Sequence, residues 1–269
     1  MGTQQRTRPP IFTINQQSPL ARGLAFAGLA CGPGAGLFQD ASLNRNDGTL
    51  TNMDPATDWV WAPELGRWAL DFKEGDWVLG PMTSVMGTQD YTVAFWFNWR
   101  AYASRGFYSL GTFTTNGHQL YTTSGGIVRH YATGGFVDVY AAPGPPLNVW
   151  THCVITRCGT AVSSWWNGIE GLGGTRAGAI TYGNTYTIGS TGVAYNLVGS
   201  MADFLVWDHR LSPPAIAALR DPSNALLRCG GSSLIREPRP LRSFLGQAGG
   251  APPAGTPWLY CRRSARIVA

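Results

Sequence analysis

The sequence has few charged residues and almost no lysine. Charged residues make up 13% of the 269 residues, Lys73 is the single lysine, and the net charge of +5 therefore comes from arginine. With 35 glycines and 11 tryptophans, the composition is that of a turn-rich β protein rather than a helical or disordered one. Arginine suits bidentate pairing at interfaces better than lysine does, although a G+C-rich coding bias would give the same preference.

Long apolar runs and paired cysteines are also missing. No segment approaches the roughly 18 apolar residues of a membrane span, and the first residues, MGTQQRTRPP, are polar where a signal peptide has an apolar core. The five cysteines form neither a CxxC pair nor a zinc spacing with histidine. We therefore expect a protein made in a cytoplasm, without a signal peptide, and with free thiols.

The motifs of common hydrolases do not occur. A retaining glycosidase needs two carboxyl groups about 5–5.5 Å apart, but no predicted strand here carries a glutamate with an acidic neighbour at strand spacing. There is also no GxSxG and no HExxH motif. The histidines are scattered, and we expect His152 and His209, on predicted central strands, to be hydrogen-bonded core residues rather than bases. The sequence thus predicts no catalytic residues and no enzyme.

What the sequence does contain is a series of short β-strand patterns. The strongest is YTVAFWFNW at Tyr91–Trp99, whose alternate residues are apolar. Further strands are predicted at Leu24–Leu29, Thr49–Asn52, Trp59–Trp61, Arg67–Phe72, Trp77–Leu79, Phe107–Leu110, Gln119–Thr122, Ile127–Tyr131, Phe136–Tyr140, Val149–Arg157, Val162–Trp166 and Thr185–Ile188. Strands at this spacing, separated by glycine and Asn-Gly turns, indicate an antiparallel sandwich.

The segment Leu197–Asp221 combines a buried strand with a short helix. Met201–His209 is apolar on both faces, Trp207 included, which is typical of a central strand. Ser212 is expected to cap the helix by accepting N–H bonds, and the prolines that follow it fit a first helical turn. We therefore predict one short C-terminal helix that packs on the sandwich.

Several of these segments, in this order, resemble the laminin-G-like, concanavalin A-like lectin-glucanase family. They are YTVAFWFNW, VWTHCVITRCGTAVSSWWNG, YTIGS and LVGSMADFLVWDHRLSPPAIAAL, with DASLNRNDGTL and RWALDFKEGDWV as further similar pieces near the N-terminus. The resemblance spans about residues 20–225. It departs at Ala215, where the family usually has an acidic residue, and at Leu43, where it usually has glycine.

The resemblance implies an all-β fold, a two-sheet antiparallel jelly-roll sandwich of the concanavalin A-like kind. We expect this sandwich at residues 19–226, with extended arms at 1–18 and 227–269. Asp203 stands where the family keeps an aspartate. Because Ala202 and Phe204 flank it, we expect a structural acceptor for the N–H groups of a turn rather than an acid catalyst.

The fold alone does not choose a function, because it carries lectins, hydrolases, adhesion modules and virion proteins. Our leading hypothesis is a non-enzymatic virion structural protein, a bacteriophage capsid-decoration or tail surface protein; this step rests on analogy with phage proteins that the sandwich resembles. It would dock on other virion proteins or on copies of itself through arginines in its arms. These are Arg6, Arg8, Arg236, Arg239, Arg242, Arg262, Arg263 and Arg266.

The alternative hypothesis is a lectin-like, carbohydrate-binding module or adhesin that recognises a host-surface glycan. Aromatic and polar side chains in the middle third could form the site: Tyr102, Arg105, His118, Tyr121, Arg129, His130 and Tyr131. Such residues also simply fill a sandwich. Nucleic acid is an unlikely partner, because the arginine-rich tail lacks a recognised binding module.

One loop could bind calcium, and no other cofactor is expected. Asp40, Asn44, Asn46 and Asp47 supply oxygen atoms within a short segment, and Ca²⁺ needs about six of these. The same residues occur in Asx turns that bind no ion. Loss of thermal stability on adding a chelator would distinguish the two.

Overall fold

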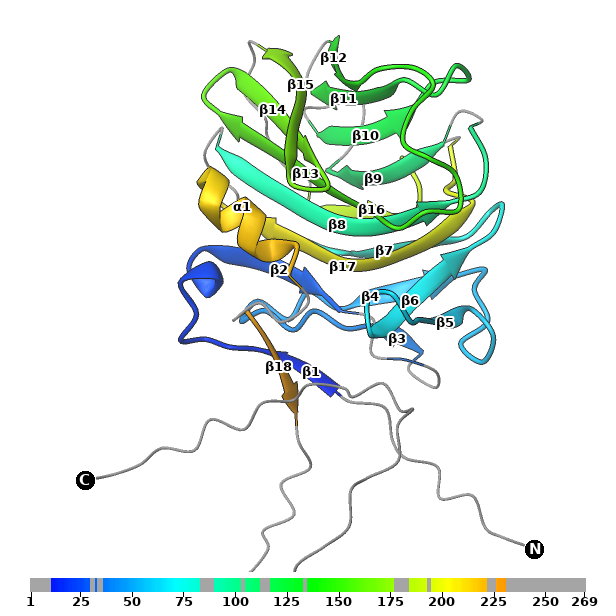
Figure 1. Cartoon of the computed structure of the whole chain (residues 1–269). Helices are drawn as coiled ribbons and strands as arrows, with labels where there is room; N and C mark the ends of the chain where they lie inside the picture. The colour runs from blue at the N-terminus through cyan, green and yellow to red at the C-terminus, as the bar shows by residue number, and fades with distance from the viewer. Residues whose placement is uncertain are drawn as a thin grey trace, which may run out of the picture. The chain divides into compact units, whose positions relative to one another are not determined.

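The computed structural model describes residues 11–29, 32, 36–82, 90–102, 105–111, 117–132, 135–176, 184–192, 195–221 and 226–230. Most of the strands belong to two antiparallel sheets that face each other (Figure 1). Between the sheets lies an apolar core, built from alternate residues of each strand. This confirms the predicted all-β, two-sheet sandwich with one short helix.

The first sheet is built around the segment that the sequence marked as central. Its strands run in the order β15 (Ile169–Thr175), β14 (Ala161–Trp166), β13 (Thr151–Cys158), β8 (Tyr91–Trp99), β17 (Gly199–Trp207), β6 (Arg67–Phe72) and β5 (Trp59–Ala62). A further strand, β2 (Leu24–Gly28), also pairs with β17. All nine residues of β17 are buried, as expected for a strand that is apolar on both faces.

The second sheet faces the first across the core. Its order is β12 (Gly135–Tyr140), β11 (Val128–Ala132), β10 (His118–Thr122), β9 (Gly106–Leu110), β16 (Thr185–Ile188), β7 (Trp77–Pro81), β4 (Gly48–Thr51) and β3 (Leu37–Phe38). Side chains from both sheets interdigitate, for example Phe95 of β8, whose ring centroid lies 5.8 Å from that of Phe107 of β9. The core is therefore largely aromatic.

β17 changes its partner at Asp203. On one side it pairs with β8 throughout, while on the other it pairs with β6 through Gly199–Met201 and with β2 through Phe204–Trp207. Asp203 has a φ of 52° and lies where the register with β8 shifts. An aspartate tolerates this left-handed conformation better than most residues, so a bulge lets one strand serve two neighbours.

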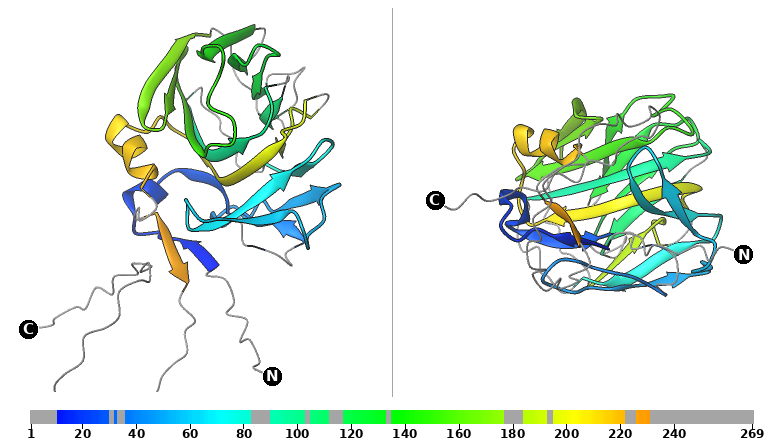
Figure 2. Two further views of the ribbon diagram at one scale, coloured as in Figure 1. Left: turned by 45° about the vertical axis from the view of Figure 1, so that its right-hand side comes forward. Right: turned by 60° about the horizontal axis from the view of Figure 1, so that its bottom comes forward.

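The helix α1 (Pro213–Leu219) covers the outer face of the first sheet, next to the ends of its strands (Figure 2). Ile216 and Leu219 are buried there with Trp207, whose indole Nε1 donates to the carbonyl oxygen of Leu20 at 2.7 Å. Ser212 occupies the N-cap position, but its hydroxyl makes no capping bond, which corrects the prediction. The second helical residue is Pro214, which has no N–H to donate.

Two further strands lie in the segments expected to be arms. β1 (Ile11–Ile14) pairs with β18 (Leu227–Gly230), and Ile11 is the partner of Gly230. The expected boundaries after residues 18 and 226 place one of these two strands in each arm, and the boundaries themselves stay a prediction. The arginines proposed for docking, at positions 6, 8, 236, 239, 242, 262, 263 and 266, lie outside the described residues.

The edge strand β15 was not expected from the sequence. It follows β14 through the predicted Asn-Gly turn, in which Asn167 and Gly168 have φ values of 53° and 81°. Its sequence, IEGLGGT, is rich in glycine and exposed along its whole length, so it lacks the apolar alternation that marks a strand.

Candidate functional site

The outer face of β10, β11 and β12 gathers aromatic and charged side chains in two rows. Tyr121, Arg129 and Asp138 are direct neighbours across the three strands. Tyr131 and Phe136 are neighbours in the adjoining row. Because strand residues alternate between faces, all five point away from the core, which Leu120, Val128 and Val137 enter from the same strands.

Contacts among these side chains fix their orientation. The Arg129 guanidinium donates from Nε to the carboxylate of Asp138 at 2.8 Å and lies 4.1 Å from the centroid of the Phe136 ring. Its ion pair with Asp138 raises the pKa of Arg129. Tyr195, from a neighbouring loop, stacks on Tyr121 with ring centroids 6.2 Å apart and ring planes 10° from parallel.

We call this set the aromatic face: Tyr121, Arg129, Tyr131, Phe136, Asp138 and Tyr195. Phe136 and Tyr195 are exposed, and the tyrosines on the strands are half-buried. Planar rings beside a guanidinium and a carboxylate can hold a ligand that has an apolar surface and several hydroxyl groups. Sequence reasoning had found Tyr121, Arg129 and Tyr131, but it had missed the other three.

The two histidines of the predicted site lie on the opposite side of the same strands, and this corrects their assignment. His118 and His130 are fully buried between the sheets beside Tyr91. The Tyr91 hydroxyl lies 2.6 Å from Nε2 of His130, and its ring stacks on His118 with centroids 4.4 Å apart. Burial lowers the pKa of His130 to about 3 and lowers that of His118 as well, so both are neutral core residues.

The remaining predicted residues, Tyr102 and Arg105, make contacts outside the aromatic face. Tyr102 packs edge-on against Trp99, and its hydroxyl donates to the carbonyl oxygen of Pro145 at 3.3 Å. Arg105 forms an ion pair with Glu74 and donates to the carbonyl oxygen of Asn196. Both residues therefore have structural partners already.

Asp203 has a structural partner, though not the one expected. Its carboxylate accepts from Nη1 of Arg67 in an ion pair that is almost fully buried, rather than from the N–H groups of a turn. Among the other histidines, His152 is buried as predicted, and burial lowers its pKa to about 3. His209 is not a core residue, because it lies half-exposed beyond β17 and contacts Asp208.

The candidate calcium loop is held by hydrogen bonds. Oδ1 of Asp40 accepts from the backbone N–H groups of Ala27 and Ser42, and Oδ2 accepts from the Ser42 hydroxyl and the N–H of Asn46, all at 2.8–2.9 Å. Asp47 accepts from the N–H of Asp40, and Asn44 donates to a carbonyl. This is the pattern of the Asx-turn alternative. Within the described residues, no group of three or more acidic, histidine or cysteine side chains could hold a metal ion.

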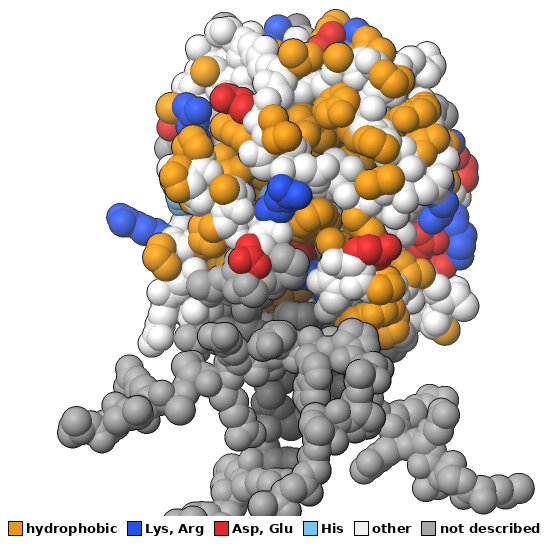
Figure 3. Space-filling view, viewed as in Figure 1, with side chains coloured by type: hydrophobic (Ala, Val, Ile, Leu, Met, Phe, Trp, Pro, Cys, Tyr) orange, Lys and Arg blue, Asp and Glu red, His pale blue; other side chains and the backbone are white. Residues whose placement is uncertain are grey.

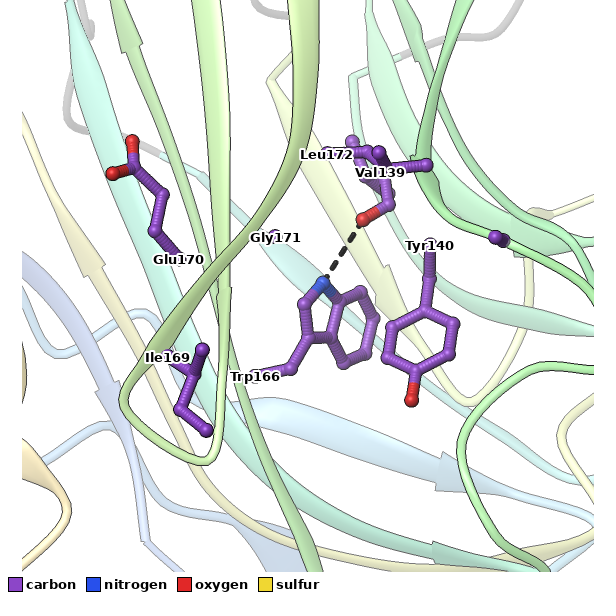
Figure 4. A pocket seen from close by; sticks show the side chains of 8 residues that line it. Val139, Tyr140, Trp166, Ile169, Glu170, Gly171 and Leu172 are labelled. Atoms are coloured by element: carbon purple, nitrogen blue, oxygen red, sulfur yellow. Dashed lines mark hydrogen bonds between the residues drawn. The ribbon is translucent and has the colours of Figure 1, made fainter.

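A hollow of about 450 Å³ lies where the edge strands β12 and β15 approach each other (Figure 4). Tyr140 and Trp166 line it, with ring centroids 4.8 Å apart and nearly perpendicular planes. Nε1 of Trp166 and the Ser164 hydroxyl both donate to the carbonyl oxygen of Val139. The Trp166 indole and the Val139 carbonyl are therefore already paired, and we call this hollow the edge pocket.

The visible surface carries charge only in small, separate groups. In Figure 3, acidic and basic side chains are surrounded by hydrophobic and uncharged ones, in line with the 13% charged residues of the chain. Among the described residues, no helix has the length and apolar character needed to cross a membrane. The described thiols Cys153 and Cys158 are free, as predicted.

Comparison with known families agrees with this architecture. The family model of the concanavalin A-like lectin/glucanases superfamily matches residues 72–217, from the end of β6 into α1. The chain belongs to this superfamily. Comparison with curated proteins finds no match in sequence.

Solved structures with the same fold include binding domains and parts of enzymes. Domain 4 of AbnA, an extracellular arabinanase from Geobacillus stearothermophilus, has a TM-score of 0.59 at 15% identity, over 74% of this chain and 98% of that one. The receptor binding domain of botulinum neurotoxin D gives 0.57 at 12%, over 75% and 53%. Trypanosoma rangeli sialidase gives 0.53 at 14%, over 72% and 32%.

These likenesses show the fold. The chain spans about half the length of the botulinum neurotoxin domains that it matches, and about a third of the sialidase. The same fold is thus found in a receptor binding domain, in one domain of an arabinanase and in part of a sialidase.

Proposed function

We propose that this chain is a non-catalytic, lectin-like module that binds a glycan on the aromatic face. The observation that carries the proposal is the outward grouping of three tyrosines and a phenylalanine around the Arg129–Asp138 pair. The C–H surface of a sugar ring packs against aromatic rings, and its hydroxyl groups pair with charged planar groups. The arabinanase domain of the same fold, solved with arabinotriose, supports the ligand class by analogy.

The single change Tyr131→Ala tests the proposal on a glycan array. We expect the wild-type protein to bind a restricted set of glycans and the variant to lose at least tenfold in affinity, about 1.4 kcal/mol. Trp61→Ala is the matched control, because Trp61 is an exposed aromatic residue of β5, in the other sheet. Absence of selective binding, or equal losses for both variants, would refute the assignment.

A virion role, as a bacteriophage capsid-decoration or tail surface protein, is our second proposal. Its support is the pairing of Ile11 with Gly230, which makes the two arginine-containing terminal segments start beside each other. Two segments that leave from one point could dock jointly on a neighbouring subunit. Sedimentation of the full chain and of a chain that ends at Gly231 tests this idea. Assembly lost only in the shorter chain supports docking, and identical behaviour rejects it.

A further inference from the structure

A second recessed site lies on the outer face of the first sheet, opposite to the sheet that carries the aromatic face. It has a volume of about 600 Å³, and we call it the tryptophan pocket. Its lining consists of Glu64, Leu65, Trp96, Asn148, Val149, Trp150 and Arg220. None of these residues was singled out by the sequence, because they come from four separate parts of the chain.

Local structure places several of the lining residues. Trp96 points outward from β8, and its ring packs on that of His152 with centroids 4.8 Å apart. Asn148 has a φ of 59° and donates its backbone N–H to the carbonyl oxygen of Trp99, which holds the loop that carries Trp150. Arg220 is the C-cap residue of α1. The pocket is therefore built on one strand, a turn, a held loop and a helix end.

The polar side chains of the tryptophan pocket have no partners among the described residues. The Glu64, Asn148 and Arg220 side chains are exposed to solvent, and they make neither hydrogen bonds nor ion pairs there. In the edge pocket, by contrast, the indole of Trp166 and the carbonyl of Val139 are already paired. A ligand in the tryptophan pocket would thus meet two indoles, a free acceptor and several free donors.

We propose that the tryptophan pocket binds a neutral saccharide ring. Indole faces suit the C–H surface of the ring, and the amide, carboxylate and guanidinium suit its hydroxyl groups. The opposite charges of Glu64 and Arg220 disfavour a ligand with net charge, since a cation would face the arginine and an anion the glutamate. The ligand class is that of the proposed function, but the site rests on separate residues.

Because the two sites lie on opposite outer faces of the sandwich, the module is bivalent. One protein could bridge two glycan chains, or bind a single surface with an avidity above that of either site. A one-site module would give neither effect.

NMR titration of protein labelled with ¹⁵N at its tryptophan indoles tests the proposal. The probes are the methyl glycosides of glucose, galactose, mannose and N-acetylglucosamine, with glucuronate and glucosamine as charged comparisons. We expect at least one neutral glycoside to shift the Trp96 and Trp150 resonances saturably, while the resonance of Trp61, outside the pocket, stays in place. Arg220→Ala should weaken this binding at least fivefold. The other resonances of the variant should keep the dispersion of a folded protein.

Three results would overturn the inference: neither indole shifts with any neutral probe, both charged probes bind more tightly than the neutral ones, or Arg220→Ala binds like the wild type. The variant Tyr131→Ala separates this proposal from the previous one. It should leave the shifts of Trp96 and Trp150 intact, and their loss would mean that the pocket is not an independent site. If the indoles shift while the aromatic face binds no glycan, only the earlier assignment fails.

Discussion

The inner and outer faces of β10 and β11 carry similar kinds of residues but hold them in different ways. On the inner face, His118 and His130 are fully buried, and Tyr91 of the opposite sheet contacts both rings. On the outer face, Tyr121, Arg129 and Tyr131 remain accessible. Strand alternation alone separates the two groups.

The role of a polar residue on these strands therefore depends on the face of the sheet to which its side chain points. A buried polar group must find a partner or stay neutral, because an unpaired buried charge costs several kcal/mol. Such groups maintain the scaffold. Polar groups on the outer faces can exchange water for a ligand, so recognition is expected there. Substitutions on the two faces should therefore differ in what they cost in stability and in binding.

The largest effect is expected for the buried ion pair of Arg67 and Asp203. Asp203→Asn keeps the side-chain shape and the tolerance of a positive φ, but it leaves the buried guanidinium beside a neutral amide. We expect the free energy of unfolding to fall by about 3 kcal/mol. Urea denaturation at neutral pH measures this loss.

The same substitution in an exposed pair is the control. Asp138→Asn changes the partner of Arg129 on the aromatic face, where both side chains are partly exposed to water. Such pairs contribute at most about 1 kcal/mol. Equal losses of unfolding free energy in the two variants would show that burial does not determine how much an ion pair contributes to stability.

Acid should destabilise the inner face. The pKa of His130 is lowered to about 3 by burial, so the unfolded chain, with an ordinary histidine pKa of about 6.5, binds the proton more readily. The stabilisation that comes from a neutral His130 is therefore fully present above pH 6.5, and it is lost as the pH falls toward 3. Between pH 7 and pH 5 this histidine alone should remove about 2 kcal/mol of unfolding free energy. The buried His118 and His152 act in the same direction.

Substitution of single histidines assigns this pH dependence. His130→Gln can still hydrogen-bond to the Tyr91 hydroxyl, and it should lose about 2 kcal/mol less than the wild type between pH 7 and pH 5. His209→Gln, at a half-exposed histidine outside the core, is measured beside it for comparison. The two stabilities are measured by urea denaturation across the pH range. A variant His130→Gln with an unchanged slope would contradict the assignment.

A smaller effect on stability, joined to a loss of binding, is expected at Arg129. Arg129→Ala removes a partly exposed ion pair and should cost less than about 1 kcal/mol of stability. If the aromatic face binds a glycan, the variant should still lose about tenfold in affinity. Arg100→Ala, which breaks the similar ion pair with Asp71, is the control for both measurements. Equal binding by Arg129→Ala and the wild type would remove the arginine from the site.

Much of the fold could be predicted because its strands follow simple patterns. Tyr91–Trp99 was predicted with the boundaries that β8 has, and β17 was correctly placed in the centre from its two apolar faces. The Asn-Gly turn before β15 was also readable. β15 itself could not be predicted, because its glycines give no alternation of apolar and polar residues. The pairing of β1 with β18 could not be predicted either, because it joins segments that are far apart in the sequence.

The candidate sites were harder to predict, for a physical reason. Tyr131 and His130 are adjacent in the sequence, yet only the register of β11 decides which one faces the core. Tyr195 and Phe136 join the aromatic face through tertiary contacts. Ser212 was placed correctly as an N-cap, but the effect of Pro214 on its hydrogen bond was not foreseen.

The smallest effect on thermal stability is expected from removal of calcium, because the buried carboxylate of Asp40 already has hydrogen-bond partners. Calcium in the loop after β3 would require Asp40 to turn from four N–H and hydroxyl donors to a metal ion. We therefore expect an unchanged melting temperature when a chelator is added and when calcium is then restored. Asp40→Asn should by contrast lower the melting temperature in both conditions, since an amide cannot accept all four bonds. A chelator-induced fall that calcium reverses in the wild type, and that Asp40→Asn lacks, would show that this carboxylate serves a metal ion rather than the turn.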